Sequence, residues 1–384
     1  MSAFWLALLA GPLSFGIAAP SLILADAARD LDVSVGAVTW IVTAFGWGIA
    51  VGTPLMAGLL GRRGVRAVLA ACGLLVLAGA VLVVTIPVLP ILVLGSAMQG
   101  FGTAGLMATA MSLAYSVRAM GLITASLAVV GSTAPLVGSL VGDALSWQAA
   151  LALPALSLLG IPASARHAPV APASRVRFDS TGAVLLMALV TALVFVPHWP
   201  VAAGVCSILA VMLLGVHLRA RPDGFVPAAL VRTPQFFVSA GLAFSLAVVN
   251  FGLIYAIPVQ LSQHAGWTTS QIGVAILWPL LFGGTVSWFV VAATARVSFR
   301  AVTTVLAAAG IVAAVTAMLS VSPLVLLIAQ AVGSVAAASG QGALAVRAAA
   351  AVPDDHRLAV IGLFNLCYLL GVAFGPAIVS LLAI

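Results

Sequence analysis

The residues able to do acid–base or metal chemistry are few and lie at the edges of apolar runs. The chain of 384 residues has eight acids, all aspartates: Asp26, Asp30, Asp32, Asp143, Asp179, Asp223, Asp354 and Asp355. Its five histidines are similarly placed: His167, His198, His217, His264 and His356. No phosphate-binding loop, HExxH or GxSxG pattern is present. We therefore interpret these side chains as interfacial polar groups and predict no enzyme activity and no cofactor.

The three cysteines give no second route to a metal or redox site. Cys72, Cys206 and Cys367 all lie inside apolar runs, and no CxxC or Cys/His spacing occurs. Isolated cysteines in such surroundings behave as small buried hydrophobes. We predict no metal site.

The composition is that of a membrane protein with many spans. Hydrophobic residues make up 64% of the chain and charged residues 6%, and the mean hydropathy is +1.28. In lipid only helices and closed barrels satisfy their backbone groups, and long unbroken apolar runs exclude the alternation of a barrel. The first run lacks a basic segment before it and is long enough to span, so it is not a cleavable signal. We predict an all-α polytopic protein whose partner is the lipid bilayer.

Thirteen apolar segments have the length of transmembrane helices. They lie at about 4–25, 37–60, 67–86, 89–113, 119–142, 147–164, 180–197, 200–218, 235–259, 270–294, 299–320, 323–346 and 358–383.

The arginines indicate the orientation of these segments. All 15 basic residues are arginines, and only Arg29 falls in a loop of the outer set. The cluster Arg62, Arg63 and Arg66 ends the second segment, and cytoplasmic loops are the ones that carry excess positive charge. The N-terminus is therefore predicted in the cytoplasm. The same distribution explains the net charge of +7 without a nucleic-acid partner.

Two polar stretches divide the chain into three parts. Segments 165–177 and 219–234 are rich in Pro, Ala and Arg and are typical of cytoplasmic linkers. We predict a six-helix bundle at 1–165, a linker with an inserted two-helix hairpin at 166–234, and a bundle of five helices at 235–384. The last part would be one helix short, with its C-terminus outside.

Several short motifs, in order, resemble those of the major facilitator superfamily, and specifically its 14-span drug:proton antiporter branch. The matching stretches open span 2, form loop 2–3, end span 4, run through span 5 and precede span 9: residues 40–45, 58–66, 99–104, 134–140 with Asp143 and 145–147, and 225–232. The resemblance implies two helical bundles, a small-molecule substrate and secondary transport. The two-helix hairpin predicted within 166–234 would correspond to the two extra spans of that branch.

The chain departs from the pattern at its charged positions. Arg62 stands where loop 2–3 of the family carries an Asp, and Ser96 stands where span 4 carries an embedded Arg. Span 1 has Leu13-Ser14-Phe15-Gly16 in place of a stretch with an acid. Acids within spans usually mark proton relays. We therefore expect weak or absent proton coupling, with Asp26 as the one candidate and a solvated loop acid as its alternative.

Two groups of candidate site residues follow. The gating and motif set comprises Gly58, Arg62, Arg63, Gly64, Arg66, Gly131, Pro135 and Gly138. The substrate-cavity set contains polar and aromatic residues away from span ends: Trp47, Gln99, Tyr115, Asn250, Tyr255, Trp278, Gln330, Asn365 and Tyr368. Proline and glycine permit bending and close approach of helices, and buried amides face a bundle interior. Packing alone is the alternative for the glycines, and hydrogen bonding between helices is the alternative for the cavity set.

The resulting functional expectation is an exporter of small amphipathic or hydrophobic compounds, of the drug-efflux type, in a bacterial plasma membrane. The alternative is a degenerate, non-transporting member that acts as a membrane binding or accessory protein. The identity of the substrate and the oligomeric state have no signal in the sequence.

Overall fold

The structure is a computed structural model that describes residues 3–113, 117–168, 179–196, 199–222, 224–226, 230, 233–294, 297–352 and 357–382. Every regular element in these ranges is helical. The predicted all-α fold is confirmed.

The first predicted span is broken into short helices. They are α1 (Ala3–Ala10), α2 (Leu13–Ala18), the 3₁₀ helix η1 (Ala19–Leu22) and α3 (Leu24–Asp30). Pro12 precedes α2 and Pro20 lies in the first turn of η1. Proline lacks the N–H that continues a helix, which explains both breaks. The segment thus crosses the bundle without being a regular helix.

The next two predicted spans form α4 (Val35–Thr85), which changes direction at Gly64. This residue has φ 76° and ψ 175°, a conformation that glycine adopts without the penalty of a side chain. Two candidate spans lie on either side, Val35–Met56 and Arg63–Thr85. Ser34 caps the start of α4 by accepting the N–H of Ala37 at 3.2 Å.

The rest of the N-terminal half consists of α5 (Leu89–Ser112), α6 (Val117–Ala144), α7 (Trp147–Leu151), η2 (Leu153–Gly160) and α8 (Ile161–Arg166). The last three together replace the span predicted at 147–164. Pro154 and Pro162 stand in the first turns of η2 and α8. They again explain why this segment is not one continuous helix.

Seven further helices follow the first linker within the described residues. They are α9 (Ser180–Phe195), α10 (Pro200–Ala220), α12 (Pro234–Ala265), α13 (Thr269–Thr294), α14 (Phe299–Leu319), α15 (Pro323–Ala350) and α16 (Arg357–Leu382). Within the described ranges, 11 helical segments are long and apolar enough to cross a membrane. The other two predicted spans are the irregular 147–164 segment and α9, which has only 16 residues. A count of 13 crossings therefore stays a prediction.

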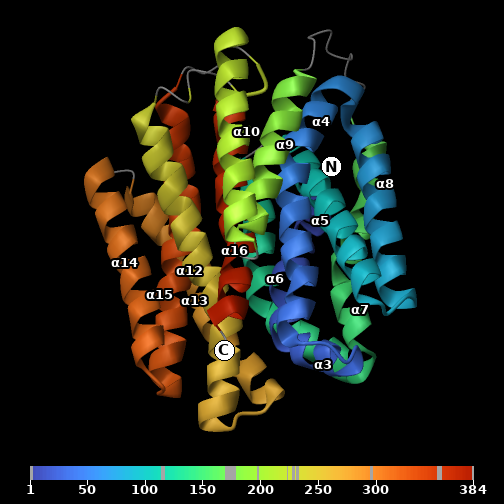
Figure 1. The fold of residues 1–384 in the computed structure, drawn as a ribbon, viewed down its shortest axis with the longest axis vertical. Coiled ribbons are helices and arrows are strands. Elements are labelled where there is room, and N and C mark those ends of the chain that lie inside the picture. Colours follow the sequence, from blue (N-terminus) through green and yellow to red (C-terminus); the bar gives the residue numbers. More distant parts are fainter. Residues whose placement is uncertain are drawn as a thin grey trace.

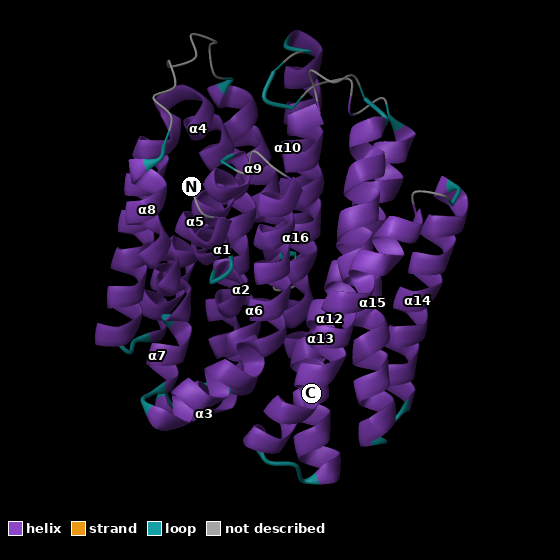
Figure 2. Cartoon of the chain, turned by 180° about the vertical axis from the view of Figure 1, so that it is seen from behind, coloured by secondary structure: helices purple, strands orange, loops and turns teal. Residues whose placement is uncertain are grey.

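The helices form two groups that meet along two seams. Helices α1–α8 lie on one side and α12–α16 on the other, as both views show (Figures 1 and 2). Helix α4 packs against α16, and α6 packs against α13. Helix α9 lies against both α4 and α16.

Helix backbones approach each other closely at several glycines. A Cβ added at Gly52 would lie 2.9 Å from the carbonyl oxygen of Phe101, and one at Gly375 would lie 2.6 Å from the backbone nitrogen of Gly252. These distances leave no room for a side chain. Small residues thus allow backbones to touch, as they do in membrane helices generally.

Candidate functional site

An apolar cluster joins the two halves at one end of the bundle, where α3 and the α12–α13 turn lie (Figure 1). Its buried members come from both halves: Leu22, Ile41 and Val42 from the first, and Ile254, Leu261 and Ile276 from the second. The arginine pattern predicts that this end faces outward. Burial of this apolar surface stabilises the contact between the halves at that end.

One hydrogen bond crosses between the halves beside this cluster. The hydroxyl of Tyr255 on α12 donates to the carbonyl oxygen of Ile17 on α2, at 2.7 Å. Tyr255 is only 5% exposed. Ile17 lies just before α2 gives way to η1, so the broken first segment supplies the acceptor. A buried hydroxyl needs a partner, so this bond holds the tyrosine in place.

A buried amide pair lies inside the second half. Gln330 of α15 donates from Nε2 to Oδ1 of Asn250 on α12, at 3.1 Å. Gln330 is fully buried, and its Oε1 has no hydrogen-bond partner. The pair therefore links two helices and leaves one acceptor available to a polar group that reaches it.

Gln99 lies inside the first half. It is fully buried, and neither of its amide atoms has a hydrogen-bond partner. A Cβ added at Gly79 would lie 2.9 Å from its Cγ. Gln99 is thus packed between α5 and the second part of α4, away from the seams.

Trp47 lies where α4, α9 and α16 meet. Its Nε1 donates to Oγ1 of Thr191 on α9, at 2.9 Å. The neighbouring Gly46 approaches α16 so closely that an added Cβ would lie 2.8 Å from Cβ of Ala373. The indole therefore occupies a seam between the halves.

The other cavity candidates are dispersed. Tyr368 is buried on α16 and Asn365 is half-buried on the same helix. Trp278 is 43% exposed and shares an exposed stripe of α13 with Val274 and Phe282. Tyr115 lies outside the described residues. The structure thus brings Trp47 and Tyr255 to the region between the halves and does not gather the whole set around one space.

The gating candidates also occupy distinct environments. Arg63 and Arg66 are exposed beside the turn at Gly64, which follows Gly58 in α4. The side chain of Arg62 lies outside the description.

The three candidates on α6 differ in how closely they pack. Helix α6 continues through the buried Pro135. A Cβ at Gly138 would lie 2.7 Å from the carbonyl oxygen of Ala19, whereas one at Gly131 would lie 3.5 Å from Cβ of Ser14. Gly138 is therefore a close-packing position and Gly131 is not.

Asp26 lies on α3, beyond the candidate span Phe4–Leu22. It forms an ion pair with Arg29 at 3.1 Å, and the side chains of Asp26 and Arg29 are 49% and 77% exposed. Exposed pairs of this kind contribute little to stability. The position matches the alternative of a solvated acid.

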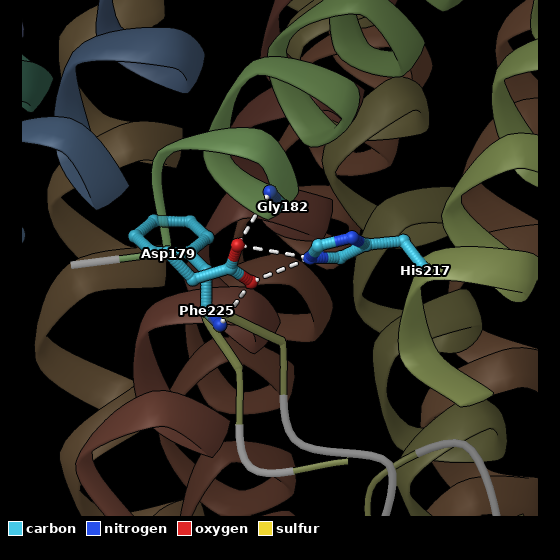
Figure 3. Close-up of polar contacts among 4 residues, drawn as sticks. All are labelled: Asp179, Gly182, His217 and Phe225. Carbon is cyan, nitrogen blue, oxygen red and sulfur yellow. Dashed lines mark hydrogen bonds and ion pairs between the residues drawn. The ribbon is translucent and has the colours of Figure 1, made fainter. Parts of the chain in front are cut away.

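The sequence analysis did not identify a polar cluster around Asp179. Asp179 accepts the backbone N–H groups of Gly182 and Phe225, each at 3.0 Å. His217 Nε2 lies 2.8 Å from Oδ2 and 2.9 Å from Oδ1 of the same carboxylate (Figure 3). The aspartate caps α9, the histidine ends α10, and Phe225 belongs to the segment that leads towards α12. We call these residues the Asp179 latch.

Opposing effects act on the pKa of Asp179, which lies outside the candidate spans. Burial raises this pKa, since the carboxylate is only 8% exposed. The N–H donors of Gly182 and Phe225, together with His217, outweigh burial and lower the pKa from 3.8 to about 2. Asp179 before Ser180-Thr181-Gly182 is a helix-cap pattern that could have indicated one of these bonds. The other bonds gave no local signal, because Asp179 and His217 are 38 positions apart.

A family model described as the Major Facilitator Superfamily matches residues 4–235. The chain belongs to this superfamily, a family of transporters and not of enzymes. The membership confirms the resemblance at the level of the superfamily.

Two curated relatives of this chain are named as transport proteins. An uncharacterized MFS-type transporter of Mycobacterium tuberculosis is 28% identical over 293 residues, covering 70% of this chain and 41% of the relative. An aspyridones efflux protein of Neocamarosporium betae is 24% identical over 240 residues, covering 54% and 42%. The chain spans about two fifths of the length of these curated relatives.

Solved structures share the fold over almost the whole chain. A human organic anion transporter superposes with a TM-score of 0.66 at 17% identity, covering 99% of this chain and 92% of that one. A nucleoside transporter gives a TM-score of 0.67 at 14% identity, covering 98% and 90%. At such identities the likeness concerns the fold alone.

Proposed function

We propose that this protein is a secondary transporter that exports small amphipathic or hydrophobic compounds by alternating access. The observation that carries the proposal is the contact between the halves at the end where α3 lies, made by the apolar cluster and the Tyr255–Ile17 bond. In alternating access, two bundles rock about a site between them. The closed end must then open, and the Tyr255 bond must break, in each cycle.

The substrate class follows from the polar groups near the seams. Trp47 and Tyr255 offer aromatic surface with a single polar tip each, and the surrounding side chains are apolar. Sites for amphipathic molecules combine apolar walls with a few placed polar groups. One distant relative is called an efflux protein, which agrees with this direction of transport.

Energy coupling is part of the same proposal. The aspartates in the described part of the chain (Asp26, Asp30, Asp32, Asp143 and Asp179) all lie at or beyond the ends of helices. A proton antiporter needs a titratable group that alternately meets substrate and proton. We propose weak or absent proton coupling: a facilitator, or a transporter of charged substrate driven by the membrane potential.

We further place the protein in a bacterial plasma membrane, with its N-terminus in the cytoplasm. The arginine pattern supports this orientation. Two curated relatives are mycobacterial.

The test is transport from loaded proteoliposomes, with a panel of lipophilic dyes as the probe. We expect dye efflux that depends on the protein and persists when no pH gradient is imposed. Accumulation driven by an imposed pH gradient, with the potential clamped, and lost in Asp26→Asn would overturn the coupling part. Dye movement equal to that of protein-free vesicles would favour the non-transporting alternative.

A further inference from the structure

The hairpin of α9 and α10 connects the two halves of the molecule. Helix α10 packs mainly on α9, and α9 contacts α4 of the first half and α16 of the second. Both views place the pair between the two groups of helices (Figures 1 and 2). A hairpin that only added two membrane crossings would not need to contact helices of both halves.

Aromatic rings at the turn of the hairpin pack against α4. The ring centroid of Trp40 lies 5.4 Å from that of Phe195 and 6.2 Å from that of Trp199. Phe195 and Trp199 stack at 5.4 Å with an interplanar angle of 12°. Aromatic pairs at such distances attract beyond the burial of their surface.

The middle of α9 is fastened by the bond from Trp47 to Thr191, described above. Trp47 follows Gly46, a position where α4 and α16 approach each other closely. The hairpin thus holds the residue that borders the contact between the halves.

The opposite end of the hairpin is fastened by the Asp179 latch (Figure 3). The latch joins the start of α9, the end of α10 and the segment around Phe225 that leads to the second half. Val226 and Leu230 of this segment are 8% and 1% exposed, so the connection is packed down as well as hydrogen-bonded. Opening the latch would leave the buried carboxylate of Asp179 without its hydrogen-bond partners, so the latch resists opening.

We propose that the α9–α10 hairpin is a strap across the α4–α16 seam, and that the Asp179 latch limits how far the halves separate there. The proposal rests on the proposed function, in which the halves move. Helix α9, with 16 residues, is about 24 Å long, less than the hydrocarbon core of about 30 Å. Its length suits attachment to the seam better than an independent crossing.

The test measures a distance across the seam. Spin labels are placed at Val35 and Leu381, exposed positions at the start of α4 and the end of α16, after Cys72, Cys206 and Cys367 have been replaced by alanine. The latch is weakened by Asp179→Asn, which keeps the shape and removes the charge, and separately by His217→Leu. The control is Asp143→Asn, which removes an exposed charge at the end of α6.

We expect both latch variants to shift or broaden the distribution of distances, and the control to match the unsubstituted protein. Thr191→Val, which removes the acceptor of Trp47 alone, should produce a smaller change in the same direction and serves if the latch variants do not fold. Distributions unchanged in every variant that folds would overturn the strap. Changed distances without any dye transport would retain the strap and reject the transporter. Dye transport with unchanged distances would support the transporter and reject the strap.

Discussion

The two seams between the halves are built differently. At the α6–α13 seam, a Cβ added at Gly284 would lie 3.4 Å from Cβ of Ala128, and one at Gly273 would lie 3.2 Å from a methyl carbon of Leu136. These are contacts between small or apolar groups, and Leu22 of η1 would also lie 3.3 Å from a Cβ at Gly273. At the α4–α16 seam the backbones are closer, and α9 lies over the junction with a hydrogen bond to Trp47. From this comparison we predict that the α4–α16 seam is more restrained than the α6–α13 seam.

The largest expected effect comes from adding a methyl group at the α4–α16 seam. Gly46→Ala places a Cβ 2.8 Å from Cβ of Ala373 and 3.1 Å from its Cα, so backbone must move. Overpacking of this kind destabilises by about 1–3 kcal/mol. Gly284→Ala, with its nearest contact at 3.4 Å, is the matched variant and should change the midpoint of thermal unfolding in detergent little. Equal losses in both variants would contradict the difference between the seams.

The second prediction concerns the pH dependence of the latch. The pKa of Asp179 in the folded protein is about 2, below its ordinary value of 3.8. Because the folded pKa is lowered, the stabilisation is fully present above pH 3.8 and is lost as the pH falls towards 2. The full difference is about 2 kcal/mol.

Thermal unfolding of the wild type and Asp179→Asn in detergent measures this effect. The two stability curves should differ by that amount near neutral pH and converge below pH 3. A constant gap down to pH 2 would show that the carboxylate charge of Asp179 is not what stabilises the latch.

Part of this picture was predictable from the sequence. Apolar runs predicted helices, and Gly64 with its arginines predicted the turn in α4, because both depend on local properties of the chain. The breaks in the first segment were missed, although Pro12 and Pro20 were visible, because the length of the apolar run dominated the interpretation.

Pairings between distant residues could not be predicted in the same way. Trp47 and Thr191 are 144 positions apart and Tyr255 and Ile17 are 238 apart. Their contact depends on how whole helices pack. For the same reason the cavity candidates, chosen by polarity, include Gln99 inside one half and Trp278 on an exposed face.

The third prediction weakens the closure between the halves. Tyr255→Phe removes the donor to Ile17 and keeps the ring. It should therefore destabilise the closed state relative to the open state by about 1 kcal/mol. That corresponds to roughly a fivefold shift in the equilibrium between the states. Tyr368→Phe is the control, because Tyr368 is also buried but lies within α16 and its cluster. Hydrogen exchange of the outer ends of α12 and α13 should increase only in Tyr255→Phe; equal exchange in both variants would remove the gating role.

The smallest expected effect is that of Thr191→Val. It removes one partly buried bond to Trp47 and should cost about 0.5 kcal/mol, because the apolar contacts of α9 remain. Thr133→Val on α6 is the control, because its hydroxyl bonds to carbonyl oxygens of its own helix. The intrinsic fluorescence of Trp47, isolated by replacing the other tryptophans with phenylalanine, should shift in Thr191→Val and stay constant in the control.

The most direct test of the account asks whether the closed end of the bundle opens during transport. A cysteine at Ile254, which is 3% exposed within the apolar cluster beside Tyr255, would be labelled with a maleimide that does not cross membranes. The account predicts slow labelling from the outer side at rest and faster labelling when a transported dye and its gradient are present. Labelling that stays slow under conditions in which dye transport is measured would contradict alternating access through this end.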